Sequence, residues 1–173
     1  MDTRLPAAPR RERSLEQLVR ELAEGDLAQR RCACQRLAEL GEEARPAAVA
    51  LVAATAEPEL VEWAAEALEN LGPPPADAVS PLRQQLTHAS ADVGYWAATL
   101  LGRMGADAAA AVGALAQALQ TSPQASVRQR AAWALGELGP AAAAAAPALE
   151  QAAQSDDPRL ARLAQGALAR VRG

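Results

Sequence analysis

Apolar residues recur at helical spacing in the fourth of five related segments of the chain. There Val127, Ala131, Leu135 and Leu138 follow one another at intervals of four, four and three residues. This spacing is typical of one face of an amphipathic α-helix and not of a strand. Gly139 comes next, and glycine reaches the left-handed conformation of a helix C-terminus without steric cost. The pattern therefore predicts a helix that Gly139 ends.

The same ten-residue pattern returns five times along the chain. Its copies start at residues 32, 63, 96, 130 and 163, so that successive starts are 31, 33, 34 and 33 residues apart. The first four copies end in a glycine, at Gly41, Gly72, Gly105 and Gly139. A period near 33 predicts stacked supersecondary units, each of which buries its apolar face on its neighbours.

A second periodic segment precedes each copy and predicts the first helix of a two-helix unit. These segments cover residues 15–23, 47–55, 81–87, 114–121 and 147–154. Ser14 and Gln17 have the spacing of a capping box. A capping side chain also stands before a proline at Ser80-Pro81, Ser122-Pro123 and Asp157-Pro158, which predicts helix starts there. We expect five helical hairpins joined by short turns.

Small residues at fixed positions indicate close packing between the predicted second helices. Half of the residues are hydrophobic, yet only four are aromatic. Alanine pairs share one register at 64–65, 97–98 and 131–132, and Leu37, Leu68, Leu101, Leu135 and Leu168 share another. Small side chains let helix axes approach closely while leucine fills the adjacent space. In the fifth unit Gln165 and Arg172 replace an alanine and a glycine, as expected of a polar terminal repeat.

The run at residues 127–139, VRQRAAWALGELG, resembles the short HEAT repeat of bilin-lyase-like proteins, whose second helix reads Val-Arg, a double Ala, Ala-Leu-Gly and a final Gly. The resemblance covers about residues 14–172 and is closest in the fourth repeat. It implies an all-α fold, a right-handed α-α superhelix (α-solenoid) of about five two-helix HEAT-like repeats. Second helices would line its concave side. Arg128 has no counterpart at Val61, Gly94 or Ala161, so no continuous arginine ladder is expected.

Two features of the N-terminal region bear on domain organisation and location. Residues 1–13 contain four arginines and two prolines and are predicted to be a disordered basic tail, followed by a single HEAT-like repeat domain at 14–173. Cys32 and Cys34, two apart on a helix, would point away from each other and predict neither a disulfide nor a metal site. With no secretory or membrane-spanning segment, we expect a cytoplasmic protein. All seventeen basic residues are Arg, which favours a GC-rich, bacterial source.

Charge narrows the choice of partner. The net charge of −4 argues against a nucleic-acid partner, because Lys and Arg normally supply that affinity by neutralising phosphates. Residues 46–82 contain no Arg, and a run of acids falls there at helical spacing, namely Glu59, Glu62, Glu66 and Glu69. This run is either a solvated helix face or a surface that attracts a basic segment. Arginines follow further along, so the surface would carry opposite charges at its two ends.

The helix face opposite the core stripe predicts the partner-binding site. In the fourth repeat this face carries Arg130, Trp133 and Glu137. The equivalent positions are Trp63, Glu66 and Asn70 in repeat two, Trp96, Thr99 and Arg103 in repeat three, and Cys32, Gln35 and Glu39 in repeat one. Two interpretations of the three tryptophans stay open. They are aromatic anchors of a recognition groove, or they lie flat over alanines and close the contacts between repeats.

No catalytic constellation is visible. His88 is the single histidine, and no nucleophile-base set, metal cluster or phosphate loop accompanies it. We therefore expect no cofactor and no membrane partner, and predict a non-enzymatic scaffold that binds a protein or peptide, with a basic segment, on its concave ridge. One alternative is a bilin-lyase-like subunit that contacts a chromophore or its carrier. Another is a HEAT-like DNA glycosylase, to which Trp133 and Glu137 are weakly similar, although such clefts are basic.

Overall fold

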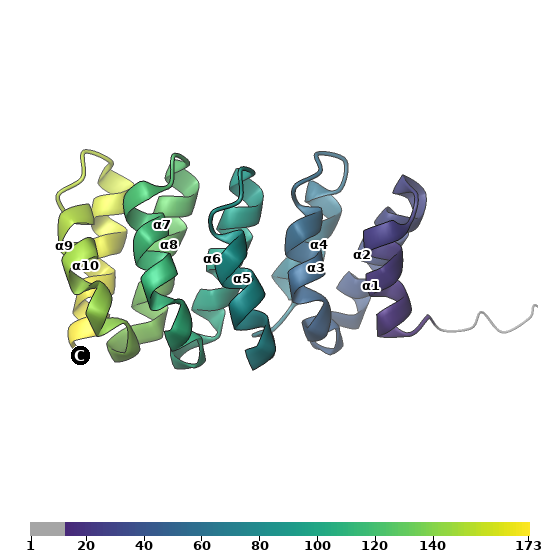
Figure 1. Cartoon of the computed structure of the whole chain (residues 1–173), viewed down its shortest axis with the longest axis horizontal. Helices are drawn as coiled ribbons and strands as arrows, with labels where there is room; N and C mark the ends of the chain where they lie inside the picture. Colours follow the sequence, from purple (N-terminus) through teal and green to yellow (C-terminus); the bar gives the residue numbers. More distant parts are fainter. Residues whose placement is uncertain (1–12) are drawn as a thin grey trace, which may run out of the picture.

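The computed structural model describes residues 13–173, which form an all-α solenoid of five helical hairpins stacked side by side (Figure 1). The first helices are α1 (Leu15–Glu24), α3 (Ala48–Ala54), α5 (Val79–Gln85), α7 (Val112–Thr121) and α9 (Ala146–Ala152). The second helices are α2 (Leu27–Leu40), α4 (Val61–Asn70), α6 (Ala91–Arg103), α8 (Ala125–Leu138) and α10 (Pro158–Arg172). The predicted fold class is confirmed. Residues 1–12 of the predicted tail lie outside the described residues.

The connections between hairpins are longer than the short turns that we expected. Three are seven-residue segments of 3₁₀ turns, η1 (Gly41–Ala47), η3 (Gly105–Ala111) and η4 (Gly139–Ala145), and η2 (Ala76–Ala78) is shorter. Non-helical backbone at Ala108 and Ala142 divides η3 and η4. Gly41, Gly105 and Gly139 begin these segments with φ of 53°, 57° and 57°, a conformation that favours glycine. Gly72 does not follow this pattern, because α4 already ends at Asn70 and an extended Leu71 leads into Pro73 to Pro75.

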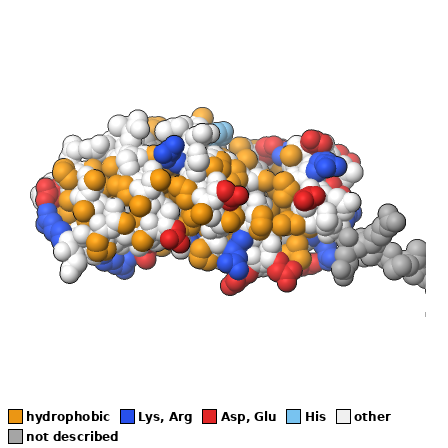
Figure 2. All heavy atoms as spheres, turned by 60° about the horizontal axis from the view of Figure 1, so that its bottom comes forward, with side chains coloured by type: hydrophobic (Ala, Val, Ile, Leu, Met, Phe, Trp, Pro, Cys, Tyr) orange, Lys and Arg blue, Asp and Glu red, His pale blue; other side chains and the backbone are white. Residues whose placement is uncertain are grey.

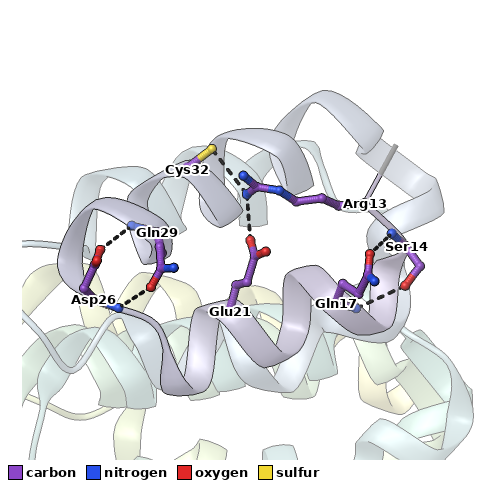
Figure 3. Close-up of polar contacts among 7 residues, drawn as sticks. All are labelled: Arg13, Ser14, Gln17, Glu21, Asp26, Gln29 and Cys32. Carbon is purple, nitrogen blue, oxygen red and sulfur yellow. Dashed lines mark hydrogen bonds and ion pairs between the residues drawn. The ribbon is translucent and has the colours of Figure 1, made fainter. Parts of the chain in front are cut away.

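The helix starts follow the sequence prediction in the outer repeats and depart from it in the inner ones. The capping box of Ser14 and Gln17 is confirmed, and Asp26 and Gln29 form a second one at the start of α2 (Figure 3). Arg13, the last residue of the predicted tail, lies beside them and pairs with Glu21 at 2.7 Å (Figure 3).

The cap at Asp157 is also confirmed, since its carboxylate accepts hydrogen bonds from two backbone N–H groups of α10. The starts predicted at Ser80 and Ser122 are wrong. Val79 already begins α5, one residue before Ser80. The backbone of Gln124, not Ser122, flanks the start of α8.

The predicted core columns are buried as expected. Leu37, Leu68, Leu101 and Leu135 have no exposed surface, and Leu168 of the terminal repeat is only half-buried. Cys34 takes the alanine register in α2 and is buried, whereas Cys32 is half-buried; both are free thiols. Figure 2 brings the lower edge of Figure 1 forward and shows hydrophobic side chains spread along the stack between scattered charged ones. In residues 13–173 no helix is long and apolar enough to cross a membrane.

The contacts between successive second helices differ along the stack. α6 packs along α8, and α8 along α10, whereas α4 scarcely touches α6. α6 packs instead on α3, and long side chains bridge this joint: Arg103 donates to the Leu68 carbonyl at 2.6 Å, and Gln85 to the Val49 carbonyl at 3.2 Å. The stack therefore consists of repeats one and two joined to repeats three to five through a looser connection.

Candidate functional site

We call the row of α2, α4, α6, α8 and α10 the second-helix face. It carries all nine residues predicted to bind a partner, but they are not equally accessible. Glu66, Asn70 and Glu137 are exposed, and Trp63, Arg103, Arg130 and Trp133 are half-buried. Trp96 and Thr99 are only 8% and 4% exposed. For these two residues the expectation of an accessible ridge is wrong, and Trp96 follows the packing interpretation.

The burial of Trp96 and Thr99 follows from the position of α6, which is covered by α3, α5 and α8. The rings of Trp96 and Tyr95 meet edge-on, with their centroids 5.6 Å apart. The guanidinium carbon of Arg103 lies 6.0 Å from the centroid of the Trp96 ring. The Thr99 hydroxyl donates to the Tyr95 carbonyl at 2.8 Å, which satisfies it within its helix. Burial lowers the pKa of Arg103, while the nearby charge of Glu69 opposes that shift.

A first hollow, of about 390 Å³, lies between α2 and α4. Its lining residues are Gln35, Ala38, Glu39, Trp63, Glu66 and Asn70. We call it the acidic hollow after its two glutamates. Sequence reasoning placed five of these six residues on one face, and the structure brings them together. Of the predicted acidic run only Glu66 lines the hollow, while Glu59, Glu62 and Glu69 are exposed elsewhere on the surface.

A second, smaller pocket of about 140 Å³ lies between α6, α8 and α10. We call it the arginine pocket; it is lined by Tyr95, Ser126, Gln129, Arg130, Trp133, Arg159 and Leu163. The Arg130 guanidinium carbon lies 4.3 Å from the Tyr95 ring centroid and 4.9 Å from that of Trp133. Arg130 also donates a hydrogen bond to the Tyr95 hydroxyl. Two aromatic rings therefore hold this guanidinium in place by cation–π contact.

Sequence reasoning found Arg130 and Trp133 but missed Tyr95, Arg159 and Leu163. Tyr95 stands one residue before the repeated pattern begins, and Arg159 and Leu163 belong to the terminal repeat, which the sequence predicts to be a polar cap. The available signal was the interval of 35 residues between Tyr95 and Arg130, close to one repeat period. That interval predicts neighbouring positions on adjacent second helices.

Arg130 and Arg159 give the arginine pocket an excess of positive charge. Burial lowers the pKa of Arg130, and the like charge of Arg159 lowers it further. Neither arginine forms an ion pair within residues 13–173. Asp157 lies beside the pocket, but Gln129 donates to its carboxylate at 2.7 Å and the α10 backbone donates to it as well. The Gln129 hydrogen bond is the main reason that the pKa of Asp157 is lowered.

A third pocket of about 100 Å³ adjoins the arginine pocket on the far side of Trp133 and is lined by Arg162, Gly166 and Arg170 among others. Trp133 packs so closely on α6 that a Cβ at Gly102 would lie 2.5 Å from its Cζ3 atom. Glu137, four residues later, pairs instead with Arg170. Both residues behind the glycosylase alternative are thus engaged within the fold, Trp133 by α6 and Arg130, and Glu137 by Arg170.

Side chains at a further hollow and at the single histidine form hydrogen bonds that stabilise local turns. A hollow of about 480 Å³ lies between α7, α9 and the start of α10, and Arg128, on its wall, donates to the Ser122 and Pro123 carbonyls. The Nδ1 atom of His88 accepts from the Ser90 backbone N–H at 3.1 Å, which fixes a turn. Residues 13–173 contain no group of three or more side chains that could hold a metal ion.

Residues 79–169, more than half of the chain, match the family model of HEAT repeats. The chain therefore belongs to the HEAT-repeat family, and the resemblance inferred from residues 127–139 is confirmed. The match spans repeats three to five, the part of the stack in which second helices pack directly on one another. No curated protein matches the sequence.

Many solved structures match the chain, among them three that resemble it over most of its length. An engineered protein is 26% identical, with 91% of this chain and 79% of that one covered and a TM-score of 0.62. The complex of CpcE and CpcF of phycocyanin lyase from Nostoc sp. PCC7120 is 26% identical, with 99% and 70% covered and a TM-score of 0.60. A designed armadillo repeat protein in complex with the peptide (KR)4 is 18% identical, with 92% and 100% covered and a TM-score of 0.51, and supports the fold alone.

Proposed function

We propose that this protein is a non-enzymatic scaffold that binds a protein or peptide segment along its second-helix face. The observation that carries the proposal is the pair of hollows of opposite charge on that face. Each contains a half-buried tryptophan, Trp63 in the acidic hollow and Trp133 in the arginine pocket. Tryptophan and arginine are the residues that most often dominate binding energy at interfaces.

The charges favour a partner segment that lies along the stack in one direction. Glu39 and Glu66 attract a basic residue at the N-terminal end, and Arg130 and Arg159 repel one at the other end. Complementary charge steers encounter and fixes orientation more than it adds affinity. The site also offers no nucleophile beside a general base among residues 13–173, which favours recognition over chemistry.

Selection from a phage-displayed library of random dodecapeptides on the full chain tests this proposal. We expect enriched peptides that carry Lys or Arg, and we expect their affinity to fall about tenfold for the variant Glu39→Gln/Glu66→Gln, as for the loss of one charge pair. The matched control is Glu16→Gln/Glu24→Gln, which removes the same charge from exposed positions of α1. No enrichment, or equal binding by both double variants, contradicts the proposal.

A second candidate function is a bilin-lyase-like subunit that contacts a chromophore or its carrier protein. It is supported by the likeness to the CpcE and CpcF complex, which extends over 99% of this chain. The acidic hollow, at about 390 Å³, has the size of small-molecule pockets, which hold about 300–1,000 Å³. Mixing the full chain with a bilin and recording its visible absorption tests this function. A shifted band that Trp63→Ala abolishes supports it, and an unchanged spectrum contradicts it.

A further inference from the structure

We infer that the arginine pocket binds a carboxylate side chain, a glutamate or aspartate of the partner, between Arg130 and Arg159. The inference rests on the proposed function and adds the chemical identity of one residue in the partner. The acidic hollow would then receive the basic part of the same segment, so the partner would carry opposite charges some distance apart.

The guanidinium of Arg130 is positioned in advance. The ring centroids of Tyr95 on α6 and Trp133 on α8 lie 4.3 and 4.9 Å from its carbon atom, and the two rings restrict its movement. A guanidinium has five N–H donors, and only the hydrogen bond to the Tyr95 hydroxyl uses one of them in residues 13–173. The remaining N–H groups can donate hydrogen bonds to a carboxylate with little further loss of side-chain entropy, because the aromatic contacts have already ordered the side chain.

The second arginine makes an anion the matching ligand. Arg159 comes from α10 and lines the same pocket, so two cations from adjacent repeats face one small volume. No carboxylate lines the pocket, and Asp157 beside it is already held by Gln129 and by the start of α10. Like charges placed close together repel, and an anion between them converts that repulsion into two charge-assisted hydrogen bonds.

Size and lining favour an amino-acid side chain over larger anions. The pocket holds about 140 Å³, well below the roughly 300 Å³ at which pockets for small molecules begin. Trp133, Tyr95 and Leu163 provide apolar walls that suit the methylene groups of a glutamate. The net charge of −4 opposes a polyanion such as a nucleic acid, which needs many cationic contacts.

The experiment titrates the full chain with N-acetyl-glutamate amide and follows the arginine Nε–Hε resonances by NMR. We expect the Arg130 and Arg159 resonances to shift at millimolar ligand, and N-acetyl-glutamine amide to leave them unchanged. Arg159→Gln should weaken the binding about tenfold, while Arg20→Gln, which removes the same charge from an exposed position of α1, should not. Arg159 is itself exposed, so its replacement leaves the fold intact even if Arg130→Gln does not.

The outcomes separate this inference from the proposed function. No shift, an equal shift with the glutamine analogue, or tighter binding of inorganic phosphate overturns the carboxylate site. Library peptides that are enriched without an acidic residue and bind Arg159→Gln as well as the unchanged chain also overturn it, while the scaffold function stands. Conversely, a specific shift with the glutamate analogue and no enriched peptide upholds the pocket and contradicts the scaffold.

Discussion

The second helices pack differently in the N-terminal half of the stack, repeats one and two, and in the C-terminal half, repeats three to five. At one register of the second helices the residue is Gly102 in α6 and Gly136 in α8, but Glu69 in α4. A Cβ at Gly136 would lie 3.0 Å from the Ala167 Cα atom, so α8 and α10 approach to backbone contact. Glu69 is exposed, and α4 scarcely touches α6. At this register glycine accompanies the close approach of neighbouring repeats, and Glu69 accompanies the joint that long side chains bridge.

The joint between the two halves coincides with a change in the connecting segment. The three prolines at residues 73–75 stand between α4 and η2, where the other hairpins have a seven-residue 3₁₀ helix. Each proline lacks a backbone N–H, so three in a row remove three donors from this segment, whereas η1 and η4 contain a single proline each. The acidic hollow lies on one side of this joint and the arginine pocket on the other. The loosely packed joint therefore lies between two regions of opposite charge.

The largest expected effect comes from Gly136→Leu, which should abolish the close approach of α8 and α10. Overpacking at backbone contact should lower the free energy of unfolding by about 3 kcal/mol. Glu69→Leu, at the same register of α4, should change it by less than about 0.5 kcal/mol, as an exposed substitution does. Urea denaturation of both variants measures the difference, and equal losses would show that the two halves pack alike.

The second effect concerns Cys34 of α2, which takes the position that alanine occupies in the second helices of repeats two to four. Burial raises the pKa of Cys34 from 9.0 to about 11, against the opposing charge of Arg30. The unfolded chain loses the thiol proton first as the pH rises, so stability falls between pH 9 and pH 11, by about 2–3 kcal/mol at the upper end. Cys34→Ala should remove this part of the alkaline decline, whereas Cys32→Ala should keep it. Denaturation midpoints across that pH range provide the measurement.

A smaller effect is expected where Trp133 covers α6. Gly102→Ala places a methyl group against the indole and the Ala134 backbone. The overpacking outweighs the gain in helix propensity and should cost about 1–2 kcal/mol, with a change in tryptophan emission. Gly166→Ala is the control, because a Cβ there meets nothing within 4 Å. It should raise the stability by about 0.5–1 kcal/mol, and a loss there would argue against the difference in packing.

The smallest effect comes from the side chains that bridge the joint. Arg103→Met removes the hydrogen bond to the Leu68 carbonyl and should cost about 1 kcal/mol in thermal or urea unfolding. Arg170→Met breaks an exposed ion pair with Glu137 and should cost less than about 0.5 kcal/mol. If Arg170→Met cost more, Arg103 would not be holding the two halves together.

Repetition made most of the fold predictable from the sequence. The columns that hold Leu37, Leu68, Leu101 and Leu135 set both the helix periodicity and the buried face, and the regular period set the stack. The caps at Ser14 and Asp157 were predictable because a side chain there bonds to its own helix start. The starts of α5 and α8 were not predictable in this way. α5 begins at Val79, directly after η2, and α8 begins at Ala125 without a side-chain cap, so neither Ser80 nor Ser122 caps its helix.

The candidate site was predictable only as a face. The sequence by itself determined that Trp63, Glu66, Arg130 and Trp133 share one side of the second helices, because helical periodicity is local. Only the tertiary structure decided that Trp96 is buried and that Arg130 lies between Tyr95 and Trp133. Those outcomes depend on how closely neighbouring helices approach, which is set jointly by residues about one repeat apart, such as Gly102 and Trp133. The pattern of one helix cannot report what its neighbour covers.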